Sequence, residues 1–252
     1  MPLITLLTDF GTADPYVAEM RGVLYSLAPG VTLADLSHGI PPGDVRAAEY
    51  LLGRAWHRFP PGTVHLVVVD PGVGTGRAAL AFGARGHRFV GPDNGVFTSV
   101  LDQADAPPVA MPVPPDAAPT FHGRDLFSPA AAALALGAQL SELGEPLPTV
   151  PVRLLLPAPF YEGKLVVGEV ISVDRFGNLV TNLTPTEVPP YAVLEVEDTE
   201  VGPLRRTFSD VESGQLVAYL GSGGQVEIAV RDGSAARQIG LGVGGRVRAR
   251  LG

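Results

Sequence analysis

The side chains able to do chemistry follow short apolar runs, at positions where strands would end. Asp70 follows three valines and opens a glycine-rich loop, residues 70–77, that ends at Arg77. The three glycines of this loop let the backbone approach a ligand closely, and Arg77 can fold back towards Asp70. A carboxylate held by a guanidinium at a strand end indicates a site that binds and orients a small polar molecule. The alternative is an ordinary strand end closed by a surface ion pair.

Other polar residues occupy comparable positions. Asp9 ends the apolar run 3–8 and is followed by a glycine, and Asn94 lies in a second loop rich in polar side chains. His122 precedes an alanine-rich stretch, where a lone histidine is more often an ordinary loop or core residue. The segment 174–178 could be only a hairpin turn, because Asp, Gly and Asn are turn residues.

Composition and motif spacing exclude several classes of function. The five histidines show no metal-ligand spacing, and no cysteine is present, so we expect neither a metal site nor disulfides. The glycine loop lacks the lysine of a phosphate-binding loop, and no Gly-x-Ser-x-Gly elbow occurs. A net charge of −8 argues against broad nucleic-acid binding. No apolar run is long enough to cross a membrane, and no signal-peptide pattern is visible, so we expect a cytoplasmic protein.

The elements that must position these residues alternate in the first half of the chain. Strand patterns at 3–8, 31–36 and 64–69 are separated by helical patterns at 16–27 and 44–59. This β-α-β-α-β order with short connections predicts a doubly wound α/β domain with a mainly parallel central sheet. Residues 104–120 are dense in proline and alanine and predict an irregular loop, and residues 126–136 predict a helix.

The second half has a different pattern. Five prolines between 144 and 159 indicate a linker, and beyond it the apolar residues alternate with period two. We therefore predict an α/β domain at 1–145, a linker at 146–160 and a smaller, barrel-like all-β domain at 161–252. The strands expected in the all-β domain are residues 164–174, 191–196, 204–208, 216–220, 226–230 and 246–250.

Five segments, taken in order, resemble one known family. They are Thr-Asp-Phe-Gly-Thr at 8–12, Val-Asp-Pro-Gly-Val-Gly-Thr at 69–75, Gly-Pro-Asp-Asn-Gly at 91–95, Phe-His-Gly-Arg-Asp at 121–125 and Asp-Arg-Phe-Gly-Asn at 174–178. Together they are similar to the S-adenosyl-L-methionine (SAM) hydroxide adenosyltransferases, relatives of the enzymes that make 5′-fluoro- and 5′-chloro-5′-deoxyadenosine. The resemblance covers about residues 3–250 and implies an α/β domain followed by a β-barrel-like domain. It also implies a homotrimer whose substrate, SAM, lies between the N-terminal domain of one subunit and the C-terminal domain of its neighbour, with no cofactor.

The resemblance also implies the nucleophile. The water-using branch of the family has an Asp-Arg-His set, which here is Asp70, Arg77 and His122. The halogenating branch lacks that acid and that histidine, and the fluorinating enzymes have a serine where this chain has Gly123. We therefore expect hydrolysis of SAM to adenosine and L-methionine, with Asp70 or His122 taking the proton. The alternatives are halide-dependent adenosyl transfer and a non-catalytic protein that binds adenosine or SAM.

The binding roles are carried over by the same resemblance. Asp9 would accept both ribose hydroxyls, and Asp174 would hold the methionine ammonium. Tyr16 falls at the methionine end, and Asn94 belongs to the polar loop of the site. The family's tryptophan in the adenine region is replaced, with Val180 nearby. The residues expected to line and close the adenine pocket are Phe176, Asn178, Ser222 and the backbone at Ala229.

Overall fold

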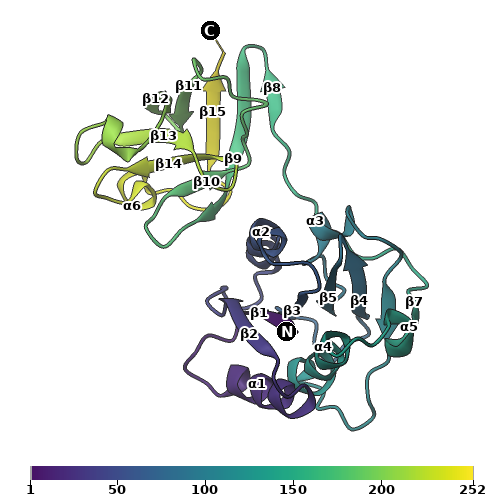
Figure 1. The fold of residues 1–252 in the computed structure, drawn as a ribbon. Coiled ribbons are helices and arrows are strands. Elements are labelled where there is room, and N and C mark those ends of the chain that lie inside the picture. The colour runs from purple at the N-terminus through teal and green to yellow at the C-terminus, as the bar shows by residue number, and fades with distance from the viewer. Residues whose placement is uncertain (1, 252) are drawn as a thin grey trace. The chain divides into compact units, whose positions relative to one another are not determined.

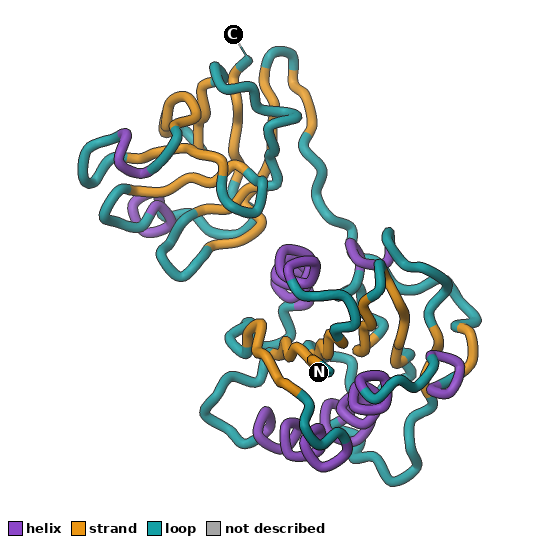
Figure 2. Tube along the Cα trace, viewed as in Figure 1, coloured by secondary structure: helices purple, strands orange, loops and turns teal. Residues whose placement is uncertain are grey.

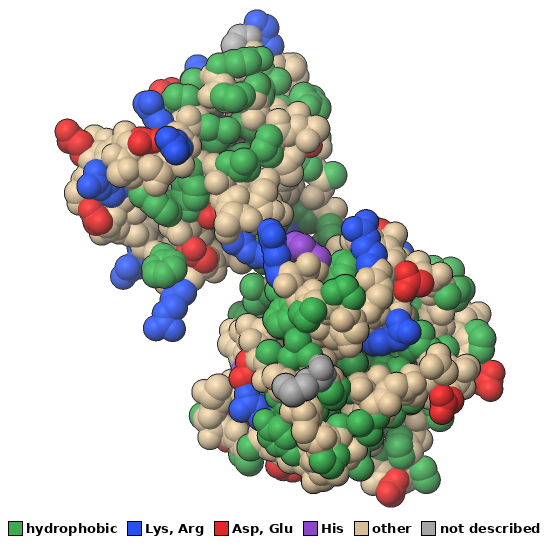
Figure 3. Space-filling model, in the orientation of Figure 1, with side chains coloured by type: hydrophobic (Ala, Val, Ile, Leu, Met, Phe, Trp, Pro, Cys, Tyr) green, Lys and Arg blue, Asp and Glu red, His purple; other side chains and the backbone are tan. Residues whose placement is uncertain are grey.

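The computed structural model describes residues 2–251, which form two compact units, unit 1 and unit 2, that divide between Leu154 and Leu155. The division falls inside the proline-rich stretch. Unit 1 combines helices with strands, whereas the regular elements of unit 2 are mainly strands (Figure 2). On the face shown in Figure 3, acidic and basic side chains are interspersed among hydrophobic and uncharged ones. None of the helices within residues 2–251 is long and apolar enough to cross a membrane.

Unit 1 is built around a seven-stranded sheet of order β2-β1-β3-β5-β4-β6-β7 (Figure 1). The first four strands in that order are parallel, β6 runs in their direction, and β4 and β7 are antiparallel to it. The strands are β1 (Leu3–Thr8), β2 (Thr32–Ser37), β3 (Val64–Val68), β4 (Ala79–Ala84), β5 (His87–Pro92), β6 (Val109–Met111) and β7 (Glu145–Pro146).

Helices cover both faces of this sheet because its strands are apolar on both sides. Leu6 packs in one core cluster with helices α1 and α4, and the adjacent Leu7 packs in another with α2. The helical segments are α1 (Tyr16–Leu27), α2 (Val45–Ala55), the 3-10 turn η1 (Trp56–Arg58), α3 (Thr98–Leu101), the π-helical turn η2 (Gly123–Phe127), α4 (Ser128–Ala135) and α5 (Leu140–Leu143). The α/β class with a mainly parallel sheet is thus confirmed.

The strand order creates a topological switch point at the carboxyl ends of β1 and β3, which we call the crevice. β1 is hydrogen-bonded to β2 on one side and to β3 on the other. The connections α1 and α2 leave on opposite faces of the sheet. In open α/β sheets ligands bind outside the carboxyl ends of the strands at such a switch point. Asp9 follows β1 and Asp70 lies just beyond β3, so both aspartates belong to this crevice.

Unit 2 is a closed barrel of seven strands, with β8 added at one side (Figure 1). Closure comes from the pairing of β10 with β9, in addition to the order β10-β14-β13-β12-β11-β15-β9-β8. The elements are β8 (Phe160–Glu162), β9 (Leu165–Val173), β10 (Leu179–Thr181), β11 (Val193–Val196), β12 (Thr199–Arg205), η3 (Phe208–Asp210), β13 (Leu216–Leu220), β14 (Val226–Val230), α6 (Ala235–Ile239) and β15 (Arg246–Arg250). The predicted barrel-like domain is confirmed.

Two buried histidines lie at the other end of the parallel strands, away from the crevice. His65, near the start of β3, forms two hydrogen bonds. Its Nδ1 lies 2.7 Å from Thr5 Oγ1, and its Nε2 lies 3.1 Å from His87 Nδ1. His65 is fully buried, and burial together with the neighbouring His87 lowers its pKa to about 3. Burial also lowers the pKa of His87. Both side chains are therefore neutral in the folded protein near neutral pH.

We predict that acid destabilises the fold through this pair. In the unfolded chain His65 regains its ordinary pKa near 6.5. Its contribution to the free energy of unfolding is therefore complete above that pH and is lost as the pH falls towards about 3. Between pH 7.5 and pH 5 the loss at His65 alone is about 2 kcal/mol. The measurement is urea unfolding at both pH values, followed by the fluorescence of the single tryptophan, Trp56, which packs against His87. His65→Gln should reduce the pH dependence, whereas the exposed His57→Gln should leave it unchanged; equal pH dependence in both variants would contradict the assignment.

Candidate active site

The glycine loop after β3 brings Asp70 and Arg77 together. Arg77 Nε donates to both carboxylate oxygens of Asp70, at 3.0 Å and 3.1 Å, and Nη2 makes a further short contact with Oδ2. The side chains are 4% and 9% exposed for Asp70 and Arg77 respectively. This ion pair is therefore shielded from solvent, unlike the surface pair that was the alternative interpretation of the sequence. Its burial strengthens the electrostatic interaction, since solvent screening is weak.

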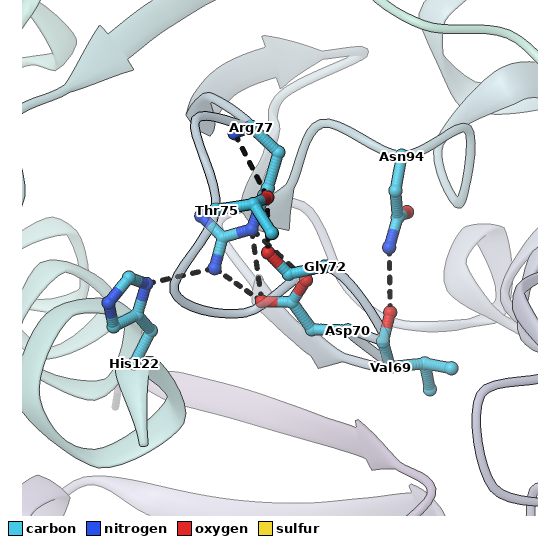
Figure 4. A network of polar contacts seen from close by, with 7 residues as sticks. All are labelled: Val69, Asp70, Gly72, Thr75, Arg77, Asn94 and His122. Atoms are coloured by element: carbon cyan, nitrogen blue, oxygen red, sulfur yellow. Dashed lines mark hydrogen bonds and ion pairs between the residues drawn. The ribbon is translucent and has the colours of Figure 1, made fainter. Parts of the chain in front are cut away.

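His122 joins the pair through the arginine (Figure 4). Arg77 Nη2 donates a hydrogen bond to His122 Nδ1 at 3.0 Å. Because arginine has no acceptor, Nδ1 must carry the lone pair, which assigns the proton of the neutral ring to Nε2. Burial and the Arg77 charge lower the pKa of His122, and the charges of Asp70 and Asp125 oppose this only in part. His122 is thus a neutral imidazole whose remaining polar group, Nε2, is a donor.

The backbone around His122 is fixed by a π-helical turn. η2 begins at the next residue, Gly123, and runs directly into α4. Arg124 in this turn donates to Glu19 of α1 (2.8 Å) and to Asp125 (2.6 Å). Asp125 in turn accepts a hydrogen bond from Ala118 N at 2.9 Å. Single π-helical turns are frequent at functional sites, and this one sets the ring of His122 towards the loop of Arg77.

Asn94 fixes the backbone next to Asp70 through its side-chain amide. Its side-chain amide donates to Val69 O at 2.8 Å (Figure 4). Its carbonyl oxygen accepts from Val96 N at 3.2 Å. Val69 immediately precedes Asp70, so Asn94 fixes the backbone from which the carboxylate projects. The preceding Asp93 is 8% exposed and accepts a hydrogen bond from Val152 N (2.8 Å), which ties residues near 152 to this loop.

Asp9 lies in the same crevice, at the end of β1. Its Oδ2 accepts a hydrogen bond from Gly43 N at 2.7 Å, and the other oxygen has no partner among residues 2–251. Tyr16, at the start of α1, is 46% exposed and packs against Phe10 and Phe121 with ring centroids 5.7 Å and 5.4 Å apart. The three rings pack together as an apolar cluster. Phe10 directly follows Asp9 in the sequence, and Phe121 directly precedes His122.

In unit 2 the segment 174–178 is a tight turn between β9 and β10. Asp174 Oδ1 accepts from Phe176 N and Asn178 N, both at 2.9 Å, and Oδ2 accepts from Asn178 Nδ2 at 2.8 Å. The hairpin interpretation of this segment is therefore correct as local structure. The turn nevertheless leaves Phe176 74% exposed, which is unusual for a large apolar side chain and makes it available to a ligand or a second surface.

The other two predicted residues of unit 2 lie at opposite ends of β14. Leu179, next to Asn178, pairs with Ile228, so Ala229 lies beside the turn. Ser222 is exposed and belongs to the turn between β13 and β14, at the other end of the strand. Val180 is buried in the barrel wall. The structure thus brings Ala229 to the 174–178 turn, while strand pairing does not bring Ser222 there.

His38 and Thr8 are components of the crevice that the sequence patterns did not single out. His38 follows β2 and is 8% exposed; its Nδ1 lies 2.8 Å from the hydroxyl of Thr8, the last residue of β1. The available signal was positional, because His38 follows a strand on the same edge as Asp9 and Asp70. Within residues 2–251, no three or more His, Cys, Asp or Glu side chains are grouped to hold a metal ion.

Comparisons with known proteins now bear on this geometry. Residues 4–144 match the model of the SAM hydroxide adenosyltransferase N-terminal domain, and residues 168–248 match that of the C-terminal domain of the same family. The chain belongs to the SAM hydroxide adenosyltransferase family. The resemblance drawn from the five sequence segments is therefore confirmed.

Individual relatives agree with this assignment. The (R)-S-adenosyl-L-methionine hydrolase of Thermus thermophilus is 46% identical over 97% of this chain and 98% of its own length. The hydrolase of the same name from Salinispora tropica is 38% identical over 100% and 98%. Fluorinases are more distant, at 28 to 30% identity. A crystal structure of an uncharacterized conserved protein from Thermotoga maritima superposes with a TM-score of 0.91 at 34% identity, covering 98% of this chain and 99% of that one.

Proposed function

We propose that this family member hydrolyses SAM to adenosine and L-methionine by attack of water at C5′ of the ribose. The observation that carries the proposal is the buried cluster of Asp70, Arg77 and His122 in the crevice of the sheet. The names of its relatives of 38 to 46% identity support the same reaction. A cytoplasmic location is part of the proposal and is supported by the absence of cysteine.

The substrate makes the leaving group easy and the nucleophile difficult. When the oxygen of water bonds to C5′, the C5′–S bond breaks and its electron pair passes to the sulfonium, which leaves as the neutral thioether of methionine. No general acid is needed for that departure. The attacking oxygen must be held in line with the C5′–S bond, and its proton must be removed. A desolvated pocket with fixed polar groups serves both requirements.

The hydrogen bonds support different tasks for Asp70 and His122. His122 accepts at Nδ1 from Arg77, so it can take up a proton there only by losing that bond. Its Nε2–H is free to donate to the lone pair of a bound water. Asp70 is acceptor-only, and a carboxylate has room for a further hydrogen bond beyond those from Arg77. We therefore assign proton uptake to Asp70 and orientation of the water to His122 and Arg77.

The binding roles complete the proposal. Asp9 offers an oxygen to the ribose hydroxyls while Gly43 holds the other oxygen. Tyr16 with its aromatic neighbours faces the methionine end, and Asn94 acts by fixing the backbone before Asp70. From unit 2, Asp174 receives the methionine ammonium, and Phe176 and Asn178, with Ser222 and Ala229, belong to the adenine pocket. SAM is the substrate and no separate cofactor takes part.

The decisive measurement is product analysis. Purified protein incubated with SAM in a chelator and without halide should release adenosine and methionine in equal amounts, followed by chromatography. Release no faster than the uncatalysed breakdown of SAM would refute hydrolysis. Halide-dependent transfer predicts 5′-chloro-5′-deoxyadenosine in chloride, and a non-catalytic binding protein predicts SAM or adenosine binding without turnover. Gly123 argues against the fluorinating reaction, because the Cβ of the serine that the fluorinating enzymes carry there would lie 3.2 to 3.3 Å from Met20, Phe121 and Val68.

A homotrimer with shared sites is the further part of this proposal, supported by the family assignment. If each site combines unit 1 of one subunit with unit 2 of the next, Asp70→Asn and Asp174→Ala subunits should complement each other. In randomly mixed trimers about a quarter of the sites then receive two intact halves, since each half is intact with probability one half. Activity per site near that fraction is expected, measured with the adenosine assay and sedimentation. Mixtures as inactive as the two separate variants would contradict shared sites.

A further inference from the structure

A chain of polar contacts, buried at Thr8 and His38 and partly exposed at Asp35 and Arg21, connects the end of β1 to the surface of α1. His38 Nδ1 lies 2.8 Å from Thr8 Oγ1, and its Nε2 lies 3.1 Å from Asp35 Oδ1. Asp35 also accepts a short hydrogen bond from Arg21 of α1. Thr8 is fully buried, and its oxygen accepts from the amide of Phe10 at 3.4 Å. These contacts lie outside the Asp70 cluster and have no part in the chemical step.

The Asp35 carboxylate beside Nε2 favours one direction for the donors and acceptors of this chain. A ring proton on Nε2 faces the carboxylate of Asp35 at 3.1 Å, and the hydroxyl proton of Thr8 then points to His38 Nδ1. Burial opposes ionisation of Asp35, but hydrogen bonds from Arg21 and His38 outweigh it, so the pKa of Asp35 lies below its ordinary value. Asp35 is therefore a carboxylate, and it fixes the orientation of the imidazole.

The backbone at His38 is bound to the loop that carries Asp9. Gly11 N donates to His38 O at 2.8 Å, so the loop after β1 is joined to the loop after β2. That second loop runs on to Gly43, whose amide donates to Asp9 Oδ2 at 2.7 Å. Two contacts thus hold Asp9. The backbone carbonyl of His38 binds the loop that carries Asp9, and Gly43, in the loop that begins at His38, binds the Asp9 carboxylate. Rotation of its carboxylate would break the bond to Gly43.

We propose that His38 is a positioning residue for the nucleoside half of the site: it holds Asp9 in the orientation that accepts the two ribose hydroxyls. The inference rests on the ribose role of Asp9 in the proposed function. His38 acts through the backbone of the two loops and does not touch the ligand. Its loss should weaken recognition of the ribose diol and leave the presentation of water by Asp70 intact.

The test measures recognition of the diol directly, with adenosine and 2′,3′-dideoxyadenosine as ligands in calorimetry. Each charge-assisted hydrogen bond from a ribose hydroxyl to Asp9 is worth about 1.5 to 3 kcal/mol, or about 10- to 150-fold, so the wild-type protein should prefer adenosine by at least about 10-fold. Asp9→Ala should bring this preference close to one. His38→Ala should reduce it to a few-fold, raise KM for SAM at least about tenfold and leave kcat within about threefold. The double variant should show the same preference as Asp9→Ala, because both changes remove one interaction.

Controls separate this role from general loosening of the fold. His87→Asn removes another buried histidine, at the opposite end of the strands, and should keep the wild-type preference. Asp35→Asn alters the partly exposed end of the Thr8–His38–Asp35–Arg21 contacts, so this variant should fold even if His38→Ala does not. It should reduce the preference for adenosine about threefold. Full preference in the His38 and Asp35 variants, or equal weakening of both ligands, would overturn the inference. If instead Asp9→Ala leaves the wild-type preference intact, the ribose role of Asp9 fails, and adenosine production by the wild-type protein still decides the hydrolase proposal separately.

Discussion

Replacement of Asp70 by asparagine should abolish adenosine formation while SAM still binds. Asparagine preserves the size of the side chain but cannot take up the proton of the attacking water. Loss of general-base catalysis typically costs 10²- to 10⁴-fold, so kcat should fall by about that factor. The dissociation constant of SAM should change little, since Asp70 acts on the nucleophile rather than on the nucleoside. Single-turnover kinetics with chromatographic detection of adenosine, together with calorimetric binding, would measure both quantities.

The same change should also lower stability, which the experiment must separate from catalysis. Removing the charge leaves the guanidinium of Arg77, whose side chain is 9% exposed, without its carboxylate. Breaking a buried pair in this way costs about 3 to 5 kcal/mol, so assays belong well below the melting temperature of the variant. Asp93→Asn is a matched control, because Asp93 is another buried carboxylate of unit 1 and accepts its hydrogen bond from the backbone of Val152 rather than from an arginine. Turnover in Asp70→Asn comparable to that of Asp93→Asn would remove Asp70 from the mechanism.

Much of unit 1 could be predicted because its elements are long and strongly patterned. The β-α-β-α-β order, and the aspartates at the ends of β1 and β3, follow from apolar runs that stop at an acid. β6 was not predicted: it is only three residues long and lies in the proline-rich stretch 104–120, where local propensity favours a loop. The antiparallel direction of β4 relative to β5 could not be predicted either, since an apolar run does not reveal strand direction.

The contacts inside the site depended on tertiary structure. Side-chain type suggested that Asn94 binds a ligand, yet its amide and carbonyl both bond to backbone atoms. The stretch 126–136 was predicted as a helix, but its first two residues belong to the π-helical turn η2, and α4 begins at Ser128 and ends at Ala135. Propensity scales do not distinguish π from α turns, because the same residues favour both. The 204–208 strand is shifted to Thr199–Arg205, where β12 pairs with β11 and then with β13.

The glycine loop itself should be sensitive at one glycine and tolerant at another. Gly74 has a φ of +77°, and a Cβ there would lie 2.7 Å from Pro119 O, on the segment that leads to His122. Alanine at this position must therefore move the loop of Asp70 and Arg77 away from the loop of His122. The 3.0 Å hydrogen bond between Arg77 and His122 spans that junction. A displacement of about 1 Å at a catalytic group can cost 10²-fold, so kcat of Gly74→Ala should fall by about that factor.

Gly76 provides the comparison within the same loop. Its φ is outside the left-handed region, and nothing lies within 4 Å of an added Cβ, so Gly76→Ala should retain kcat within about twofold. Both variants remove the same backbone freedom from the unfolded chain, which cancels when the two are compared. Gly74→Ala should also make His122 easier to protonate, because Arg77 then no longer holds Nδ1. The pH dependence of the His122 ring signals in NMR would move upwards in Gly74→Ala and not in Gly76→Ala. Equal kcat values in the two variants would mean that the close approach at Pro119 does not set the geometry of the catalytic cluster.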